Sequence, residues 1–292
     1  MTFEQLANLD LTEQASLTSG GTAWSTASVR DVVRALHVAD GPHGLRRTAE
    51  GGSVFAPSAP ATCYPPAVTM GSSWDPGLLR RVGAAVAREA CALRVDVVLG
   101  PGVNIKRSPL CGRNFEYFSE DPHVSAAMGA ALVHGIQSLG VGACLKHFAV
   151  NNQETDRMRV SADVDERTLR ELYLPAFEHI VREAKPYAVM SSYNRVNGVH
   201  ASEHPWLLTR VLREEWGFDG LVMSDWGAVS DRVASLEAGL DLQMPPNGTD
   251  DQITSAVEEG RLDREAVARA AGRVLQLQER VDRAPDFGEW DV

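Results

Sequence analysis

The sequence predicts an α/β fold in which parallel strands build a TIM-type (β/α)8 barrel that is incomplete or partly collapsed. Short apolar runs alternate with helix-forming segments along the 292 residues, as in chains that form parallel sheets. Several runs end abruptly in charged or polar residues, and a barrel brings such strand ends together at one rim. Six to seven strands can be recognised, fewer than the eight of a regular barrel. No glycine-rich nucleotide-binding motif links a strand to a helix, which disfavours an open doubly wound sheet.

Strand and helix signals alternate through the first half of the chain. A strand is predicted at 35–40, where an apolar run ends in Asp40 and a turn-forming Gly-Pro pair follows. Asp75 and Pro76 stand in the preferred order for a helix cap and first turn, ahead of an apolar stripe. The elements predicted here are a helix from Thr12, strands at 35–40 and 65–69, a helix from Asp75, a strand at 95–99, a helix at 125–139 and a strand at 143–148.

The second half continues this alternation. The segment 220–224 is apolar and β-favouring, is flanked by glycines, and is read as a short buried strand that delivers Asp225 at its end. The other elements predicted are a helix from Asp165, a strand at 187–192, helices at 205–215 and through Leu236, a strand at 240–244, and a closing helix with an apolar face from Val267 to Val281. We expect one domain over 1–283 and a linker or tail at 284–292.

Composition argues against nucleic-acid binding and against a membrane-spanning chain. The formal charge is −11 and the sequence pI is near 5.2, so the surface offers no basic field for phosphates. No window approaches about 18 uninterrupted apolar residues, and no basic segment precedes an apolar run at the start, so a cytoplasmic location is expected. The four cysteines form no Cys-x-x-Cys pair and are expected to be reduced and structural.

The polar residues at the predicted strand ends suit a ligand rich in hydroxyl groups, because charged groups can hold several hydroxyls in fixed directions. Asp225 could attack the anomeric carbon of a sugar or stabilise the positive charge that develops there. Nearby Lys146, Arg113 or Arg157 would then hold the pKa of Asp225 low. Each residue also has a structural interpretation: Asp225 could cap a helix, and His147 could serve core hydrogen bonding.

Four segments carry a resemblance to glycoside hydrolase family 3, and together they cover nearly the whole chain in order. The segment that contains Asp225 is similar to the active-site signature of that family. The four segments are Asp40-Gly-Pro-His-Gly-Leu-Arg46, Gly112-Arg-Asn-Phe-Glu-Tyr-Phe-Ser-Glu-Asp-Pro122, Lys146-His-Phe-Ala-Val-Asn-Asn-Gln-Glu-Thr-Asp-Arg157 and Val211-Leu-Arg-Glu-Glu-Trp-Gly-Phe-Asp-Gly-Leu-Val-Met-Ser-Asp-Trp-Gly-Ala228.

The resemblance implies a retaining β-glucosidase-type barrel with Asp225 as the nucleophile, acting on a β-glucoside or another β-glycoside. It implies that Met190 and Trp226 supply apolar walls, and that no metal or organic cofactor takes part. It also implies that the nonreducing sugar is held by Asp40, Arg113, Lys146, His147, Arg157 and Tyr193.

One feature of the family is missing from its expected place. The family's β-glucosidases usually continue into a sandwich domain that carries the glutamate acid/base, and no such domain is present in these 292 residues. The branch that works with a barrel alone uses a loop histidine, but the loop after Phe148 has none. Three explanations stand open: the chain is part of a longer enzyme, a partner chain completes it, or a local carboxyl group such as Glu116 or Glu154 substitutes.

Two other functions, a binding domain and a different class of enzyme, are also compatible with these residues. The chain could be a sugar-binding domain that keeps the pocket without turnover. Alternatively, Lys146 could form a Schiff base, as in aldolases built on similar barrels.

Overall fold

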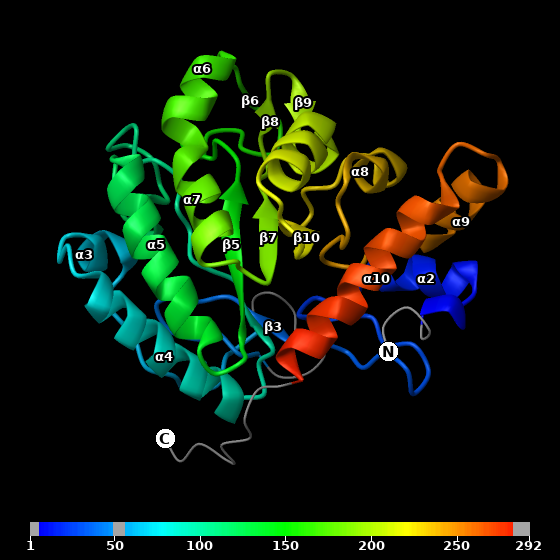
Figure 1. Ribbon diagram of the computed structural model, residues 1–292, viewed down its shortest axis with the longest axis horizontal. Coiled ribbons are helices and arrows are strands. Elements are labelled where there is room, and N and C mark those ends of the chain that lie inside the picture. Colours follow the sequence, from blue (N-terminus) through cyan, green and yellow to red (C-terminus); the bar gives the residue numbers. More distant parts are fainter. Residues whose placement is uncertain (1–5, 49–55, 283–292) are drawn as a thin grey trace.

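Figure 1 shows the fold of the chain as a computed structural model, in which residues 6–48 and 56–282 are described. Five short parallel strands form a central sheet in which each strand lies beside the next one along the chain. They are β3 (Val38–Ala39), β4 (Val97–Val98), β5 (Gly142–Phe148), β7 (Ala188–Ser191) and β10 (Leu221–Ser224). This order is that of a barrel wound in one direction, so the predicted α/β class is confirmed.

Isolated backbone bridges extend this sheet into a closed ring. A hairpin of β1 (Gly20–Thr22) and β2 (Ser25–Thr26) lies between the end of the sheet and its beginning. The bridges that complete the ring join Met223 to Leu242, Gln243 to Ser19, and Ser25 to His37, which precedes β3. The barrel is therefore incomplete: single bridges and a hairpin take the place of regular strands.

Helices α4, α5 and α7 lie side by side along one flank of the sheet (Figure 1). The α-helices are α2 (Leu11–Leu17), α3 (Ala67–Gly71), α4 (Pro76–Ala92), α5 (Pro122–Gln137), α6 (Glu166–Thr168), α7 (Pro175–Glu183), α8 (Arg232–Ala238), α9 (Asp250–Glu258) and α10 (Arg264–Val281). The shorter or irregular elements are η1 (Asn114–Glu116), β6 (Ser161–Ala162), the π-helix η2 (Leu169–Tyr173), β8 (Arg195–Val196), β9 (Val199–His200), η3 (Ala201–Glu203) and the π-helix η4 (Trp206–Glu215). Asp75 caps α4 by accepting a hydrogen bond from the Leu78 amide at 3.0 Å, as the sequence predicts.

The strands are buried on both faces, which explains why they appear in the sequence as continuous apolar runs. Residues such as Val98 and Leu145 point outward and pack with the helices of the large core. Alternating neighbours such as Val97 and Cys144 point inward, where they pack against Val274 and other residues of α10. The inner face is therefore filled by side chains, as in other barrels of parallel strands.

Two predicted strands differ from the structure. Residues 65–69 contribute to helix α3, because Ala67, Met70 and Gly71 are buried at helical spacing and Pro66 occupies the cap position. The predicted strand at 240–244 is an extended segment joined by single bridges. Its ladder is interrupted because the Asp241 carboxylate takes the Val222 amide, and Pro245 follows. Helix α9 was not predicted, and the tail at 284–292 lies outside the described residues.

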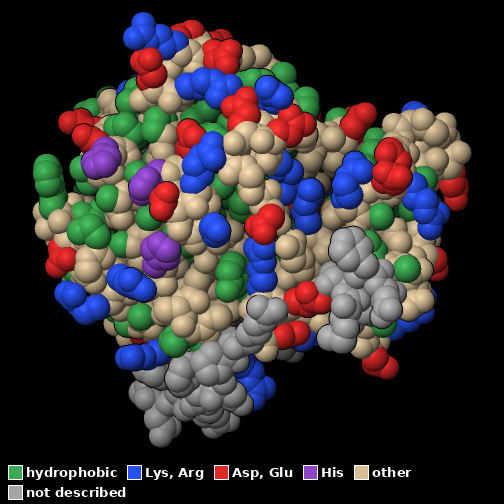
Figure 2. Space-filling view, in the orientation of Figure 1, with side chains coloured by type: hydrophobic (Ala, Val, Ile, Leu, Met, Phe, Trp, Pro, Cys, Tyr) green, Lys and Arg blue, Asp and Glu red, His purple; other side chains and the backbone are tan. Residues whose placement is uncertain are grey.

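The surface carries charges of both signs, interspersed over the face shown in Figure 2. All four cysteines are free, as the sequence predicts, and Cys111 and Cys144 are buried. Within residues 6–48 and 56–282, no helix is long and apolar enough to cross a membrane.

Asp241 is a buried carboxylate that ties β10 to two helices. It accepts hydrogen bonds from Arg213 Nη2 of η4 and from Arg273 Nη1 of α10, each at 2.6 Å. It also accepts the backbone amide of Val222 in β10 at 2.8 Å. Because β10 ends at the residue before Asp225, these contacts fix the strand that places the candidate nucleophile.

We expect Asp241→Ala to lower the free energy of unfolding by about 3–5 kcal/mol, because it leaves a buried cation without its partner. The Arg213 side chain is only 10% exposed and cannot turn to water without repacking. Asp219→Ala is the control: its ion pair with Arg280 lies at the surface, the carboxylate is 69% exposed, and the expected loss is about 0–1 kcal/mol. Urea unfolding midpoints measure both changes, and equal effects would contradict the assignment.

Candidate active site

A pocket of about 500 Å³ lies at the C-terminal ends of the central strands. All nine residues predicted from the sequence line it: Asp40, Arg113, Lys146, His147, Arg157, Met190, Tyr193, Asp225 and Trp226. The convergence follows from the topology, because parallel strands place their carboxyl ends at one rim.

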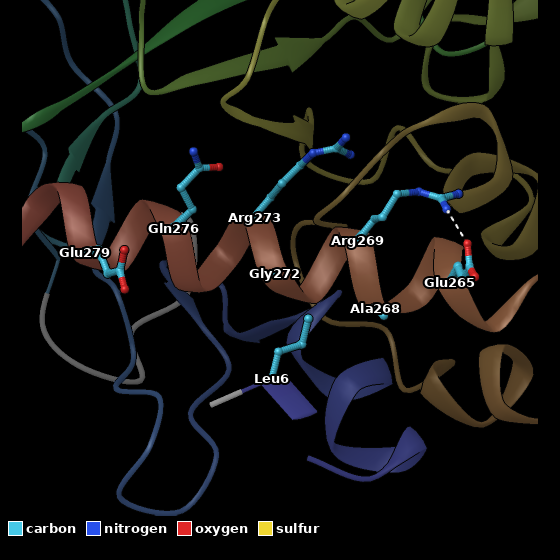
Figure 3. A pocket seen from close by; sticks show the side chains of 8 residues that line it. All are labelled: Leu6, Glu265, Ala268, Arg269, Gly272, Arg273, Gln276 and Glu279. Carbon is cyan, nitrogen blue, oxygen red and sulfur yellow. Dashed lines mark ion pairs between the residues drawn. The ribbon is translucent and has the colours of Figure 1, made fainter. Parts of the chain in front are cut away.

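A larger hollow of about 630 Å³ runs along α10 (Figure 3). Its lining comes from one helix together with Leu6, which lies over Gly272. The ion pair within it, Arg269 to Glu265, spans 3.7 Å and is exposed. No strand end contributes to this hollow, so the smaller pocket is the candidate active site.

Asp225 is buried immediately after β10, and its two carboxylate oxygens differ. Oδ1 accepts the Trp226 backbone amide at 2.7 Å. Oδ2 lies 3.6 Å from His147 Nε2 and has no hydrogen-bond partner among the described residues. A buried carboxylate oxygen without a partner is costly, and such oxygens persist mainly where they serve a function.

Burial raises the pKa of Asp225 above its usual value, and the positive charges of Arg113 and Lys146 offset only part of this rise. The expectation that nearby cations hold this pKa low is therefore wrong in direction. The physical reason is that the carboxyl group loses more hydration on burial than the cations return. The cations limit the rise, which keeps an ionised form accessible.

Lys146 is the centre of an alternating set of charges. Its ammonium donates to Asp40 Oδ1 at 2.8 Å and lies 3.9 Å from Glu116 Oε2. Burial lowers the pKa of Lys146, but the two carboxylates raise it further, so the net shift is upward and the group stays charged. In turn, burial opposes ionisation of Asp40, and Lys146 lowers the pKa of that carboxyl below its usual value. The Lys146 side chain is 4% exposed and that of Asp40 is 43% exposed, which leaves Asp40 accessible to a ligand.

Arg113 and His147 lie beside Asp225. Arg113 is paired with Glu116 through Nε, and its Nη2 contacts His147 Nε2 at 2.7 Å. Burial, together with Arg113, Lys146 and Arg157, lowers the pKa of His147 well below its usual value. His147 is therefore neutral, and it adds no charge to the pocket.

Aromatic rings form part of the pocket wall. Trp226 lies near Trp24, with ring centroids 5.4 Å apart, and its Nε1 donates to the Ala23 carbonyl at 2.8 Å. The hydroxyl of Tyr193 donates to the Trp226 carbonyl at 3.1 Å, and the Arg157 guanidinium lies 4.4 Å from the Tyr193 ring centroid. These contacts fix the rings in place beside the nucleophile candidate.

Five further residues line the pocket and were not predicted as sugar ligands: Trp24, Arg46, Leu99, Phe115 and Glu116. Three of them stand inside the segments that carry the family resemblance, so the sequence signal was present but their roles were not assigned. Trp24 comes from the turn between β1 and β2, where no strand periodicity points to the pocket. Trp24 reaches the pocket only because the ring of strands closes, and the sequence carries no separate pattern that indicates this closure.

A search of family models matches residues 27–277 to the glycosyl hydrolase family 3 N terminal domain. This match spans most of the chain and includes every predicted site residue. The chain belongs to glycosyl hydrolase family 3.

Curated relatives of this family 3 domain carry two kinds of name. It is 54% identical over 280 residues to an exo-α-(1→6)-L-arabinopyranosidase of Bifidobacterium longum, covering 94% of this chain and 37% of the relative. It is 51% identical over 277 residues to thermostable β-glucosidase B of Acetivibrio thermocellus, covering 93% of this chain and 37% of the relative. The chain thus spans a little over a third of these relatives.

Solved structures agree with this fold. The structure of the family 3 β-glucosidase of Bifidobacterium adolescentis superposes with a TM-score of 0.92 at 52% identity, over 98% of this chain and 42% of that one. β-Glucosidase 3B of Thermotoga neapolitana, solved in complex with α-D-glucose, gives 0.90 at 41% identity, over 98% of this chain and 43% of that one.

The raised pKa of Asp225 predicts that its carboxyl group titrates above the ordinary value of 3.8. The charged form is therefore lost earlier as the pH falls than it would be at the surface. Carboxyl ¹³C NMR measures this midpoint, and the signal is assigned by its absence from Asp225→Asn. A midpoint at or below 3.8 would show that the cations outweigh burial after all.

Proposed function

We propose that the chain is the barrel domain of a retaining β-glycoside hydrolase of the β-glucosidase type, with Asp225 as the nucleophile. The observation that carries the proposal is the unpartnered Oδ2 of Asp225 in a pocket that also holds Lys146, Arg113 and Arg157. The names of the relatives support the substrate class, and the glucose-bound relative supports the sugar.

In this mechanism Asp225 Oδ2 forms a bond to the anomeric carbon while the bond to the leaving-group oxygen breaks. The leaving oxygen takes a proton from a general acid, and water later hydrolyses the glycosyl ester to regenerate the carboxylate. The transition state carries positive charge on the sugar, which the negative charge of Asp225 stabilises. Retention of configuration follows from the two successive displacements.

The remaining groups suit the binding of a pyranose ring. Asp40 is fixed by Lys146 yet partly exposed, so it can accept hydrogen bonds from hydroxyl groups away from the reacting bond. Arg113 and Arg157 line the pocket as donors, while Met190 and Trp226 supply apolar surface. Most hydroxyl groups of the sugar would thus meet charged partners, which fix the direction of the hydrogen bonds and also add affinity.

The proton donor is not evident among the carboxyl groups that line the pocket. These are Asp40, Glu116 and Asp225, and the first two are engaged with Lys146 and Arg113. Glu154, the other local alternative, is outside the pocket lining and accepts a hydrogen bond from Arg157 at 2.9 Å. A carboxylate paired to a cation is a poor acid. We therefore propose that the acid/base comes from a further sandwich domain or a partner chain.

The Schiff-base alternative is disfavoured by the state of Lys146. An attacking amine must be neutral, whereas the pKa of Lys146 is raised by Asp40 and Glu116 and its ammonium is paired. Binding without turnover stays open as an outcome of the experiments that follow.

Asp225→Asn should abolish covalent labelling by a 2-deoxy-2-fluoro-β-glucosyl donor, because the amide cannot displace the leaving group. Asp225→Asn should still fold, and its free energy of unfolding at neutral pH should exceed that of the unmodified chain. The raised pKa means that ionised Asp225 costs the folded state stability once the pH exceeds that pKa, and asparagine carries no charge. Intact mass spectrometry and urea unfolding measure the two effects.

The control for labelling is Asp251→Asn, which changes an exposed carboxylate of α9 outside the pocket. This variant should label like the unmodified chain. An Asp225→Asn protein that still gains the sugar mass would refute the nucleophile, and a chain that binds glucose by calorimetry without any adduct would favour the binding domain.

The isolated chain should discriminate strongly between leaving groups. Loss of general acid assistance costs about 10²- to 10⁴-fold in rate, and the loss is smallest when the leaving group is a stable anion. We expect an activated aryl β-glucoside to glycosylate Asp225, and alkyl glucosides or disaccharides to react barely or not at all. Comparable turnover of both types would point to an acid within this chain. Aryl α-L-arabinopyranoside, tested in parallel, decides which sugar is preferred.

A further inference from the structure

We propose that Glu154 is a positioning residue that holds the Arg157 guanidinium over the Tyr193 ring at the pocket wall and so strengthens sugar binding. This inference rests on the proposed function of the pocket, in which Arg157 donates to a hydroxyl group of the sugar. Glu154 does not line the pocket, whereas Arg157 and Tyr193 do. Glu154 therefore acts through Arg157 and makes no contact with the sugar.

Glu154 and Arg157 are joined twice within one turn of the loop that follows β5. The Arg157 amide donates to the Glu154 carbonyl at 3.3 Å, and Arg157 Nη1 donates to Glu154 Oε2 at 2.9 Å. Their spacing of three residues brings the carboxylate beside the guanidinium when the turn forms. Within residues 6–48 and 56–282, this is the only ion pair that Arg157 makes.

The guanidinium of Arg157 is thus held on two sides. Its central carbon lies 4.4 Å from the centroid of the Tyr193 ring, within the range of a cation–π interaction. That ring is itself fixed, because the Tyr193 hydroxyl donates to the Trp226 carbonyl at 3.1 Å. The bond to Glu154 uses Nη1 alone, so the Nε and Nη2 groups remain as donors for a ligand.

Arg157 needs such a contact because packing alone does not fix it. Its side chain is 37% exposed, and an arginine side chain loses much conformational freedom when a ligand orders it. Glu154 orders the side chain before the sugar arrives, so less of that freedom is lost on binding. The sugar is therefore bound more tightly when Glu154 is present.

The second carboxylate oxygen of Glu154 argues against a role in stability alone. Oε1 is buried and accepts no hydrogen bond from the described residues, and burying such an oxygen costs free energy. The next pair in the same loop, Asp156 with Arg159, has the same spacing of three residues, and its side chains are 63% and 79% exposed. An ion pair that served only the loop could adopt this exposed arrangement and avoid that cost.

The test compares variants of these two pairs. Glu154→Ala removes the contact, Glu154→Gln keeps an oxygen that can accept from Nη1, and Asp156→Asn removes the charge of the surface pair as the matched control. Asparagine suits position 156, where φ is 52°, because it tolerates the left-handed backbone. Labelling by the 2-deoxy-2-fluoro donor gives the maximal rate constant and the half-saturating concentration. Calorimetry with glucose gives the Kd, and urea unfolding checks that each variant is folded.

We expect Glu154→Ala to raise the half-saturating concentration and the Kd for glucose about 2- to 10-fold, with an unchanged maximal rate constant. Glu154→Gln should show a smaller rise, and Asp156→Asn none. An unchanged half-saturating concentration in Glu154→Ala would overturn the proposal. So would a fall in the maximal rate constant alone, which would make Glu154 a participant in the reaction.

A double-mutant cycle shows whether Glu154 acts through Arg157. In an Arg157→Ala background, Glu154→Ala should have no further effect on the second-order labelling constant, because the side chain that it positions is gone. A further loss as large as the one in the unmodified chain would refute the positioning role.

A ligand-free measurement separates this proposal from the proposed function. ¹H–¹⁵N spectra at low temperature resolve the Nη protons of an arginine where its guanidinium rotates slowly, and the signals of Arg157 are assigned by their loss in Arg157→Ala. They should be resolved in the unmodified chain and in Asp156→Asn, and averaged in Glu154→Ala. If the unmodified chain neither labels nor binds glucose, the proposed function fails and the link to sugar binding falls with it. The spectra then still decide the contact: signals that stay resolved in Glu154→Ala show that Glu154 does not hold Arg157.

Discussion

The structure depends on one costly placement, a carboxylate buried at the end of strand β10. Burial raises the pKa of Asp225, and the nearby charges of Arg113 and Lys146 counteract part of that rise. Those cations are themselves buried and need partners of their own, which Glu116 and Asp40 provide. One buried negative charge thus requires an alternating set of charges around it, and the barrel rim is the place where four separate chain segments can supply that set.

The need to keep Asp225 beside its cations also explains why the end of strand β10 is held firmly. A shift of β10 would displace Asp225 from its cations, and the cost of an isolated buried charge is several kcal/mol. Asp241 anchors β10 by accepting a hydrogen bond from the Val222 amide. Two arginines from different helices hold the Asp241 carboxylate in place. Packing and electrostatics therefore act together here, because the strand that Asp241 holds is the one that leads to the candidate nucleophile.

Much of this arrangement was predictable from sequence, for a topological reason. Parallel strands converge at their carboxyl ends, so polar residues that end apolar runs had to meet, and all nine predicted residues line one pocket. The misses have physical causes as well. A five-residue apolar run such as 65–69 fits a strand or a buried helix equally well. Ring closure through Ser19 and Gln243 uses single bridges, which leave no periodic signal, and this hid the approach of Trp24. The pKa of Asp225 depends on how deeply the carboxyl group is buried, and this depth cannot be predicted from the sequence.

The distribution of charge in the pocket also restricts where a proton donor can stand. Lys146 holds the pKa of Asp40 below its usual value, so that carboxyl group is kept ionised and is a poor proton donor. An acid needs the opposite surroundings, with little positive charge and much apolar surface. That surface exists in the lining formed by Trp24, Phe115 and Trp226, and the Phe115 side chain is 55% exposed. A carboxyl group carried in against these rings would gain the raised pKa that protonating a leaving group requires. The pocket therefore combines a charged region around Asp225, which would suit the proposed nucleophile, with an aromatic lining that would suit the proposed acid.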